Sequence, residues 1–349
     1  MTQLKSSRKI ATTSALRRAT MADVATAAGV SQITVWRALN SPDKVSHDTR
    51  TSIARAIEHT GYVPDLTARS LVSQRSRLAA AIVPNIQDPV FGGIIQKLSD
   101  RLEEREFQLL LGSTSYSPKS EFKIITTCLS WRVDGIVVTG CLEDSKLRRL
   151  LKRVGVPVVE TWNISKRPVD MSVGFSNAAA AQEMTGHLIK AGYRRIALSA
   201  RAEDTNDRTR DRYRGFLSSM NAAGLEPAGF YEFDEQSVMQ GASLIRRLSS
   251  QRVMPDAIFF TSDILAVGAM DECRRLGIRI PQQLGIAGFG DLDIGSLAHP
   301  ALTTVRTFGD EIGNVAAECL IARFEGRRVD RRVVDVGFEI VSRESTARS

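Results

Sequence analysis

One stretch near the N-terminus, Thr20 to Asn40, constrains the fold most strongly, because it encodes two short helices joined by a tight turn. Thr20 and Asp23 have the spacing of a capping box, which satisfies amide groups that the first helical turn leaves free. Gly29 stands where the chain must turn sharply, in a conformation that costs glycine little. Ser31 is a good N-cap for the second helix. The stretch therefore predicts a helix-turn-helix.

The second helix, predicted over residues 32–39, has an inward and an outward face. Val35, Ala38 and Leu39 gather on the inward face because of the 3.6-residue helical period. An alanine-rich helical hairpin of another kind would show the same pattern, so the DNA-binding interpretation needs further support. The candidate DNA-binding residues of this motif are Thr20, Ser31, Gln32, Ile33, Thr34, Trp36, Arg37 and Asn40.

A third helical pattern gives that support, running from the N-cap Ser46 to a stop at Gly61 and completing a compact headpiece. The run DVATAAGVSQITVWRALN, followed by VSHDTR and GYVPDLTARSL, resembles the lactose-repressor (LacI) family of bacterial regulators in order and spacing. The resemblance continues over nearly the whole chain. Within this family, the sequence most resembles the gluconate-repressor branch. The segments that carry this resemblance are SWRVDGIVVTG, VPVVETW, VGFSNAAAA, DILAVGAMDECRRLGI and GFGDLDIG.

From Leu78 onward, continuous apolar runs alternate with amphipathic helical patterns, which predicts α/β structure with parallel sheets covered on both faces. The resemblance implies an N-terminal all-α helix-turn-helix headpiece followed by a two-lobed α/β effector domain that is similar to periplasmic binding proteins. We expect a disordered basic tail over residues 1–18, the headpiece over 19–64, a hinge helix and linker over 65–76, and an effector-binding and dimerisation domain over 77–345.

The order of the C-terminal elements also follows from the resemblance. We expect LTTVRT and the helical residues 311–325 to return to the first lobe, and residues 333–340 to end in the second. In the second lobe, a helix is predicted over residues 212–223, after a charged loop that spans residues 201–214.

The net charge of +8 is concentrated at the N-terminus, because residues 1–77 hold 12 Lys and Arg against 5 Asp and Glu and so carry +7. Such asymmetry indicates a polyanionic partner. With the helix-turn-helix, it predicts binding to double-stranded operator DNA. Arg37 is the strongest single candidate, since arginine paired with guanine is the commonest specific contact in the major groove.

Residues 66–73 predict a helix of about two turns, which is marginal by itself in water and should order only when something packs on it. In the family that the chain resembles, two such hinge helices pair in the minor groove and insert a leucine between base steps. The matching positions are Ala68 and Leu71. Asp65 and Leu66 replace the usual Asn-Arg pair, which removes a cation. A simple connector remains the alternative.

The charged loop follows a strand end, so it should border the crevice between the lobes. The resemblance places Arg212 where the family holds its effector, with Arg208 and Arg210 as weaker candidates. Gly290 stands where many relatives that bind neutral sugars or purines have an aspartate. Phe91 and Trp162 equally suit ordinary packing. The candidate effector-binding residues are Phe91, Trp162, Ser176, Arg208, Arg212, Ser262, Asp263, Gly290 and Asp291.

Several other classes of protein lack their signatures here. No nucleotide-binding, zinc-protease or hydrolase motif is present, so we expect no enzyme, no catalytic residue, no cofactor and no metal site. No run of apolar residues suits a membrane span or a secretory signal, so a cytoplasmic protein with no membrane partner is expected. A transport-type solute receptor would carry such a signal. The four cysteines are widely spaced and should be reduced, mostly buried thiols.

The predicted function is a homodimeric repressor of carbohydrate catabolism that a sugar acid, such as gluconate or 6-phosphogluconate, releases from its operator. An arginine fork matches a carboxylate or phosphate, whereas a buried aspartate would repel it. A neutral sugar or nucleobase effector, or an activating role, remains the alternative. No leucine heptads follow the last predicted strand, so dimers should be the limit of assembly.

Overall fold

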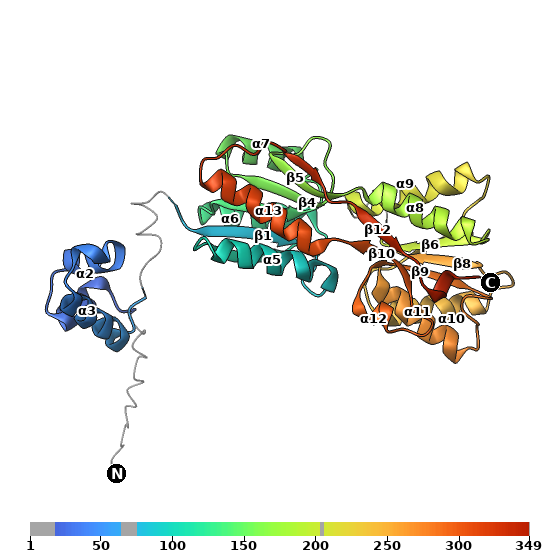
Figure 1. Ribbon diagram of the computed structural model, residues 1–349, viewed down its shortest axis with the longest axis horizontal. Helices are drawn as coiled ribbons and strands as arrows, with labels where there is room; N and C mark the ends of the chain where they lie inside the picture. Colours follow the sequence, from blue (N-terminus) through green and yellow to red (C-terminus); the bar gives the residue numbers. More distant parts are fainter. Residues whose placement is uncertain (1–17, 64–74, 203–205, 349) are drawn as a thin grey trace, which may run out of the picture. The chain divides into compact units, whose positions relative to one another are not determined.

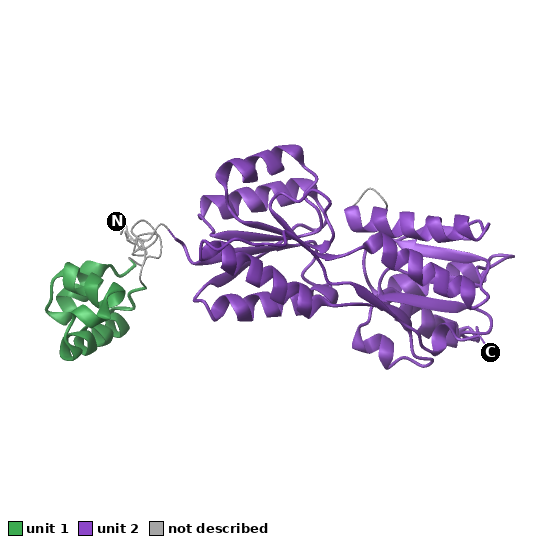
Figure 2. Cartoon of the chain, turned by 45° about the horizontal axis from the view of Figure 1, so that its top comes forward, with its two compact units in different colours: residues 1–74 green, residues 75–349 purple. Residues whose placement is uncertain are grey.

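The computed structural model of the protein describes residues 18–63, 75–202 and 206–348 (Figure 1). The chain divides into two compact units, residues 1–74 and 75–349 (Figure 2). Every regular element described in the first unit is a helix, and the second unit holds two separate six-stranded sheets covered by helices. The predicted fold class is therefore confirmed.

The first unit forms the three predicted helices. The capping box of Thr20 and Asp23 is present, and Gly29 adopts the left-handed conformation at φ 66°. Gly61 does the same at the end of the third helix, at φ 64°. Val24, Val35 and other apolar side chains from all three helices make one small core. The elements are α1 (Met21–Ala28), α2 (Gln32–Asn40), η1 (Pro42–Lys44) and α3 (His47–Thr60).

The first sheet of the second unit has the strand order β11-β5-β4-β3-β1-β2. Its apolar strands bury alternate residues on opposite faces. Ala79 and Ala81 pack towards α5 and α13, whereas Ala80 and Ile82 pack towards α6 and α7. Its strands are β1 (Leu78–Val83), β2 (Gln108–Ser113), β3 (Gly135–Thr139), β4 (Val158–Asn163), β5 (Met171–Phe175) and β11 (Val333–Asp335). Its helices are η2 (Pro89–Phe91), α5 (Gly92–Glu103), α6 (Pro118–Ser130), α7 (Ser145–Val154) and α13 (Gly309–Phe324).

The second sheet has the order β12-β10-β9-β8-β6-β7 and the same construction, with α8 and α9 on one face and α10 and α11 on the other. We call the two sheets with their helices the first and second lobes. The strands here are β6 (Ile196–Ala200), β7 (Gly229–Glu232), β8 (Ala257–Phe260), β9 (Gly285–Gly290), β10 (Thr303–Thr307) and β12 (Phe338–Val341). The helices are α8 (Asn177–Lys190), α9 (Asp207–Ala222), α10 (Val238–Ser249), α11 (Asp263–Arg275), α12 (Asp293–Ser296) and η4 (Glu344–Thr346).

The C-terminal crossings differ from the prediction. The segment LTTVRT, expected in the first lobe, forms β10 of the second sheet, where it pairs in parallel with β9 and antiparallel with β12. The helical segment does return, because α13 packs against α5, β4 and β5. Residues 333–340 divide between the lobes. β11 pairs with β5, and β12 enters the second sheet after a turn at Gly337, whose φ is 74°.

The charged loop is also shorter than predicted. Helix α9 begins at Asp207 rather than at Arg212, with Asn206 as its N-cap accepting a hydrogen bond from the amide of Thr209 at 3.0 Å. Arg208 and Arg212 therefore lie one turn apart on the same side of a helix, and Arg210 lies on another side. The first turn of α9 has few apolar residues, so the sequence pattern did not indicate that the helix begins there.

Candidate functional site

The exposed side of α2 is the candidate DNA-binding surface of the first unit. Val35 is fully buried in the headpiece core, whereas Ile33 is 62% exposed and Trp36 is 37% exposed. The core holds the inward face of the helix, so the outward side chains project from a fixed backbone. The exposed residues of this surface are Gln32, Ile33, Trp36 and Arg37.

The remaining candidates of the motif secure helix ends. The hydroxyl of Ser31 accepts from the amide of Thr34 at 3.1 Å, and the two hydroxyl oxygens lie 2.9 Å apart. The side-chain amide of Asn40 donates to the carbonyl of Trp36 at 2.9 Å. Thr20 caps α1. Two further candidates, Ala68 and Leu71, lie outside the described residues.

A cavity with about 530 Å³ of empty space lies between the two lobes, at the carboxyl ends of their strands. Ligands of open α/β sheets bind at such strand ends. We call it the arginine pocket, because three arginines line it. Its wall includes Asp88, Phe91 and Trp162 from the first lobe, and Arg201, Arg208 and Arg212 from the second.

Phe91 and Trp162 are two of the aromatic residues on the first-lobe side of the arginine pocket. Phe91 is 4% exposed and Trp162 is 1% exposed, and their ring centres lie 5.2 Å apart in an edge-to-face arrangement. Trp162 has a φ of 72°, a left-handed conformation that is rare for a bulky residue. Such strain persists only where the surrounding structure imposes it, and it is concentrated at ligand sites.

Arg212 is fixed by neutral groups. Its Nε donates to Asn177 Oδ1 at 2.8 Å, its Nη1 donates to the carbonyl of Thr261 at 3.2 Å, and its Cζ lies 3.6 Å from the centre of the Phe289 ring. Burial lowers the pKa of Arg212 to about 9, and the neighbouring charge of Arg208 adds to this effect. The side chain is still charged at neutral pH. Within the described part of the chain it forms no ion pair, so its charge suits an anionic ligand.

Arg208 lines the arginine pocket, as expected of an effector contact, but its charge is already paired. Its Nη1 donates to Asp207 Oδ1 at 3.1 Å and to the carbonyl of Thr139 at 3.0 Å. Asp207 Oδ2 also accepts from the amide of Cys141 at 3.0 Å. These bonds join α9 of the second lobe to the end of β3 in the first. Arg210 pairs with Glu143 and does not line the pocket, which corrects the expectation that it flanks the effector.

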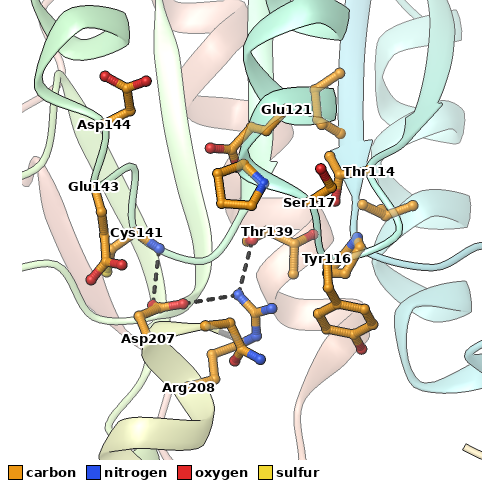
Figure 3. A pocket seen from close by; sticks show the side chains of 15 residues that line it. Thr114, Tyr116, Ser117, Glu121, Thr139, Cys141, Glu143, Asp144, Asp207 and Arg208 are labelled. Carbon is orange, nitrogen blue, oxygen red and sulfur yellow. Dashed lines mark hydrogen bonds and ion pairs between the residues drawn. The ribbon is translucent and has the colours of Figure 1, made fainter. Parts of the chain in front are cut away.

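A second cavity, with about 610 Å³ of empty space, lies at the ends of β1, β2 and β3. Figure 3 shows Ser117 and Glu121 around the same hollow as Asp207 and Arg208. Burial raises the pKa of Glu121 to about 7; the charge of Arg208 opposes this rise, and that of Asp207 adds to it. Tyr116 and Arg208 line both cavities and so form part of the wall between them.

Ser262 and Asp263 begin α11 but face different surroundings. Ser262 lines the arginine pocket and caps the helix, accepting from the amide of Ile264 at 3.3 Å. Asp263 is fully buried, and its two oxygens accept from the hydroxyl of Thr304 at 2.6 Å and the amide of Leu292 at 2.7 Å. Burial raises its pKa to about 6. Asp263, a predicted effector contact, therefore bonds groups inside the second lobe.

Three other candidates are not among the residues that line either cavity. Ser176 caps α8, accepting from the amide of Ala179 at 3.1 Å. Asp291 pairs with Arg306 at 2.6 Å and Arg343 at 2.7 Å, and these bonds hold its pKa below the usual value against the effect of burial. Gly290 borders the first lobe, since a Cβ there would lie 3.4 Å from Val90 Cγ2.

Two charged residues of the arginine pocket were missed in the sequence. Asp88 is 7% exposed and its carboxylate accepts from the amide of Val90 at 3.2 Å. Arg201 follows β6 directly, and its Cζ lies 4.0 Å from the centre of the Tyr116 ring. Arg201 directly follows strand β6, and Asp88 follows strand β1 by a few residues. These positions after strands were the sequence signal that could have identified both residues. The long charge run around Arg201 concealed it.

Other kinds of site are not found in the residues that the structure describes. They contain no group of three or more His, Cys, Asp or Glu placed to hold a metal ion. None of the described helices is long and apolar enough to cross a membrane. All four cysteines are free; three are buried, and Cys141 is half-buried.

Comparisons with known proteins agree with this arrangement. Residues 20–65 match the profile described as bacterial regulatory proteins, lacI family, and residues 185–346 match a periplasmic binding protein-like domain. The chain is 34% identical over 325 residues to the HTH-type transcriptional regulator GntR of Escherichia coli (strain K12), covering 93% of this chain and 97% of that one.

Solved structures show the same fold. A LacI-family transcriptional regulator from Silicibacter pomeroyi superposes with a TM-score of 0.88 at 31% identity, covering 95% of this chain and all of that one. The lac repressor dimer bound to operator superposes with a TM-score of 0.78, covering 95% of this chain and 99% of that one. Its 22% identity supports the fold alone.

Proposed function

The chain belongs to the LacI family of bacterial regulatory proteins and is a transcriptional regulator similar to GntR, and on this premise we propose that it represses genes of carbohydrate catabolism. A sugar acid such as gluconate or 6-phosphogluconate would bind the arginine pocket and release the protein from its operator. The regulator would work in the cytoplasm, where its DNA lies, and its role is binding rather than catalysis.

The proposed DNA contact is the exposed face of α2. Gln32, Ile33 and Arg37 would read base edges in the major groove, and Trp36 would lie against sugar-phosphate or a thymine methyl group. The exposure of these side chains on a helix with a packed inner face supports this assignment. So does the surplus of positive charge in residues 1–77, which neutralises phosphates. The headpiece would span residues 19–64, and the hinge would span residues 65–76.

The proposed effector contact is Arg212, because of the surroundings of its guanidinium group. Its guanidinium lines a cavity, stacks on Phe289 and bonds only neutral acceptors among the residues described. A buried charge without a counter-ion is costly, and a carboxylate or phosphate offers the planar fork a charge-assisted partner. Phe91 and Trp162 would pack on the carbon chain of the ligand, and Ser262 would bond a hydroxyl.

The proposed coupling uses the closure of the two lobes. A pair of headpieces in a symmetric dimer would bind a roughly palindromic operator, and a ligand that changes the lobe arrangement would change the distance between them. A ligand shifts this equilibrium only by its different affinity for the two states, and coupling of about 1–3 kcal/mol is usual.

Calorimetry of the full chain against gluconate, 6-phosphogluconate, glucose and a purine tests the effector class. We expect the acids to bind and the neutral compounds to be silent. The acid that binds should also weaken binding to operator DNA from the promoter region beside the gene, measured by fluorescence anisotropy. Tight binding of glucose or a purine, with the acids silent, would refute the sugar-acid proposal but leave the family unchanged.

A further inference from the structure

Arg201 is held rigidly on the wall of the arginine pocket. Its Cζ lies 4.0 Å from the ring centre of Tyr116 in the first lobe and 5.5 Å from that of Phe233 in the second. Its Nη1 donates to the carbonyl of Asp234 at 2.6 Å. Stacking on aromatic rings and a backbone bond fix a guanidinium without neutralising its charge.

No carboxylate of the described residues forms an ion pair with Arg201. The residue is half-buried, but its Nε is fully buried and has no hydrogen-bond acceptor among the described residues. Leaving a charged donor buried and unpaired is costly, so such groups usually meet a counter-ion or a ligand. Among the described residues that line the pocket, Asp88 carries the only carboxylate, and it already accepts a hydrogen bond from the amide of Val90.

Arg212 repeats this arrangement, whereas Arg208 does not. Arg212 also stacks on an aromatic ring and bonds neutral acceptors, while Arg208 is paired with Asp207 at 3.1 Å. The charges of Arg201 and Arg212 both act on Asp88, so all three groups surround one space. The pocket thus offers two cations that form no ion pair with a described residue, and one buried acid that suits hydroxyl groups.

We propose that Arg201 is a second anion-binding residue, and that the effector carries an acidic group at each end with hydroxyls between them. This inference rests on the proposed function and narrows it, because gluconate has one acidic group only. The second group is a phosphate or a carboxylate. A sugar acid phosphorylated at its far end and an aldaric acid both have the required chemistry.

Calorimetry of the full chain tests the inference with gluconate, 6-phosphogluconate and glucarate, and with glucose as a neutral control. At least one of the doubly acidic compounds should bind about tenfold or more tightly than gluconate, since each charge-assisted contact is worth that factor. R201Q should reduce this advantage to about threefold or less, and it should change the affinity for gluconate by less than about threefold. These four measurements form a cycle that isolates the contact between Arg201 and the second acid.

R247Q is the matched control. Arg247 also stacks on a ring, 5.5 Å from the centre of Tyr231, but it does not line the pocket. All affinities of this variant should match those of the unaltered protein. The comparison of ligands on the unaltered protein remains decisive if R201Q does not fold.

Each result has a defined meaning. Equal affinities for gluconate and both diacids would overturn the inference while the sugar-acid proposal stood. Equal weakening of gluconate and diacid binding by R201Q would show that Arg201 only packs the wall, and would also overturn it. Binding of glucose alone would refute the proposed function itself. Preference for 6-phosphogluconate or for glucarate supports the inference and identifies the second group.

Discussion

The guanidinium carbon of Arg212 lies 3.6 Å from the centre of the Phe289 ring, so a side chain of α9 is stacked on the end of β9. Both residues line the arginine pocket. The ring fixes the plane of the guanidinium, which determines the direction in which its N–H groups point. A preset fork loses little conformational freedom when an acid binds, and this favours affinity.

Arg212→Ala should abolish most effector binding. Truncating one partner of a buried, hydrogen-bonded charge pair costs about 2–5 kcal/mol, which is a loss of affinity of roughly thirtyfold or more. Arg210→Ala is the control two residues away, because Arg210 pairs with Glu143 outside the pocket. Its affinity should stay within about twofold. Calorimetry with the preferred acid measures both, and equal effects would contradict the assignment.

Arg37→Ala should weaken binding to operator more than binding to random DNA. A bidentate arginine–guanine contact is worth about 1–3 kcal/mol of discrimination, whereas non-specific binding depends on phosphate contacts. Anisotropy titrations at several salt concentrations separate the two contributions. Unchanged affinities for both DNAs would exclude Arg37 from the interface.

Asp207→Asn should destabilise the second unit. It removes the charge that neutralises Arg208 and weakens bonds to Cys141 and Asn163 of the first lobe. Breaking a buried ion pair costs about 3–5 kcal/mol. The pKa of Asp207 is held below its usual value of 3.8, so its stabilising contribution is present above that pH and is lost on acidification.

The control for Asp207 is Asp271→Asn, which alters an exposed ion pair on α11 and should leave the melting temperature nearly unchanged. Thermal unfolding of both variants at neutral pH provides the comparison. Equal melting temperatures for the two variants would show that the Asp207 bonds between the lobes add nothing to stability.

Asp263→Asn should become progressively more favourable as the pH rises. The pKa of Asp263 rises from 3.8 to about 6 on folding, so its protonated form is preferred in the native protein. The raised pKa therefore adds to the free energy of unfolding. This contribution is fully present below pH 3.8 and is lost as the pH rises to about 6. The difference amounts to about 3 kcal/mol.

Asparagine cannot ionise but still bonds both the amide of Leu292 and the hydroxyl of Thr304, so Asp263→Asn removes the pH dependence of this site. Urea unfolding at pH 5 and pH 8 measures the free energy of unfolding of both proteins, and about 1.4 kcal/mol of the total difference is lost between these two pH values. If the difference between variant and unaltered protein is the same at the two pH values, the carboxyl does not titrate in this range.

The protein should assemble as a dimer of chains of 38.3 kDa. A symmetric dimer presents two headpieces to the two halves of a palindromic site. By resemblance, its interface would involve α5 and neighbouring elements of the second lobe. Light scattering at micromolar concentration should give twice the chain mass. A stable tetramer would contradict the prediction.

The local features of the headpiece could be predicted from short stretches of the sequence. The capping box of Thr20 and Asp23, the turn at Gly29 and the caps at Ser31 and Ser46 all formed as predicted. These features depend on residues at most a few positions apart, so their physics is contained in the sequence. The α/β class was equally accessible, because buried parallel strands leave continuous apolar runs, whereas the two-lobed architecture was implied by the family resemblance.

Which side chains meet in the arginine pocket depends on how the elements pack in three dimensions. The residue at which α9 begins determines which way its side chains point. Arg212 therefore points into the pocket, and Arg210 pairs with Glu143. Arg201 and Asp88 converge although they come from different lobes. Such encounters follow from strand pairing and lobe packing over long sequence separations. A linear pattern does not encode the resulting distances. The sequence therefore did not reveal that Asp263 is hydrogen-bonded inside the second lobe, or that Arg201 forms no ion pair with the described residues.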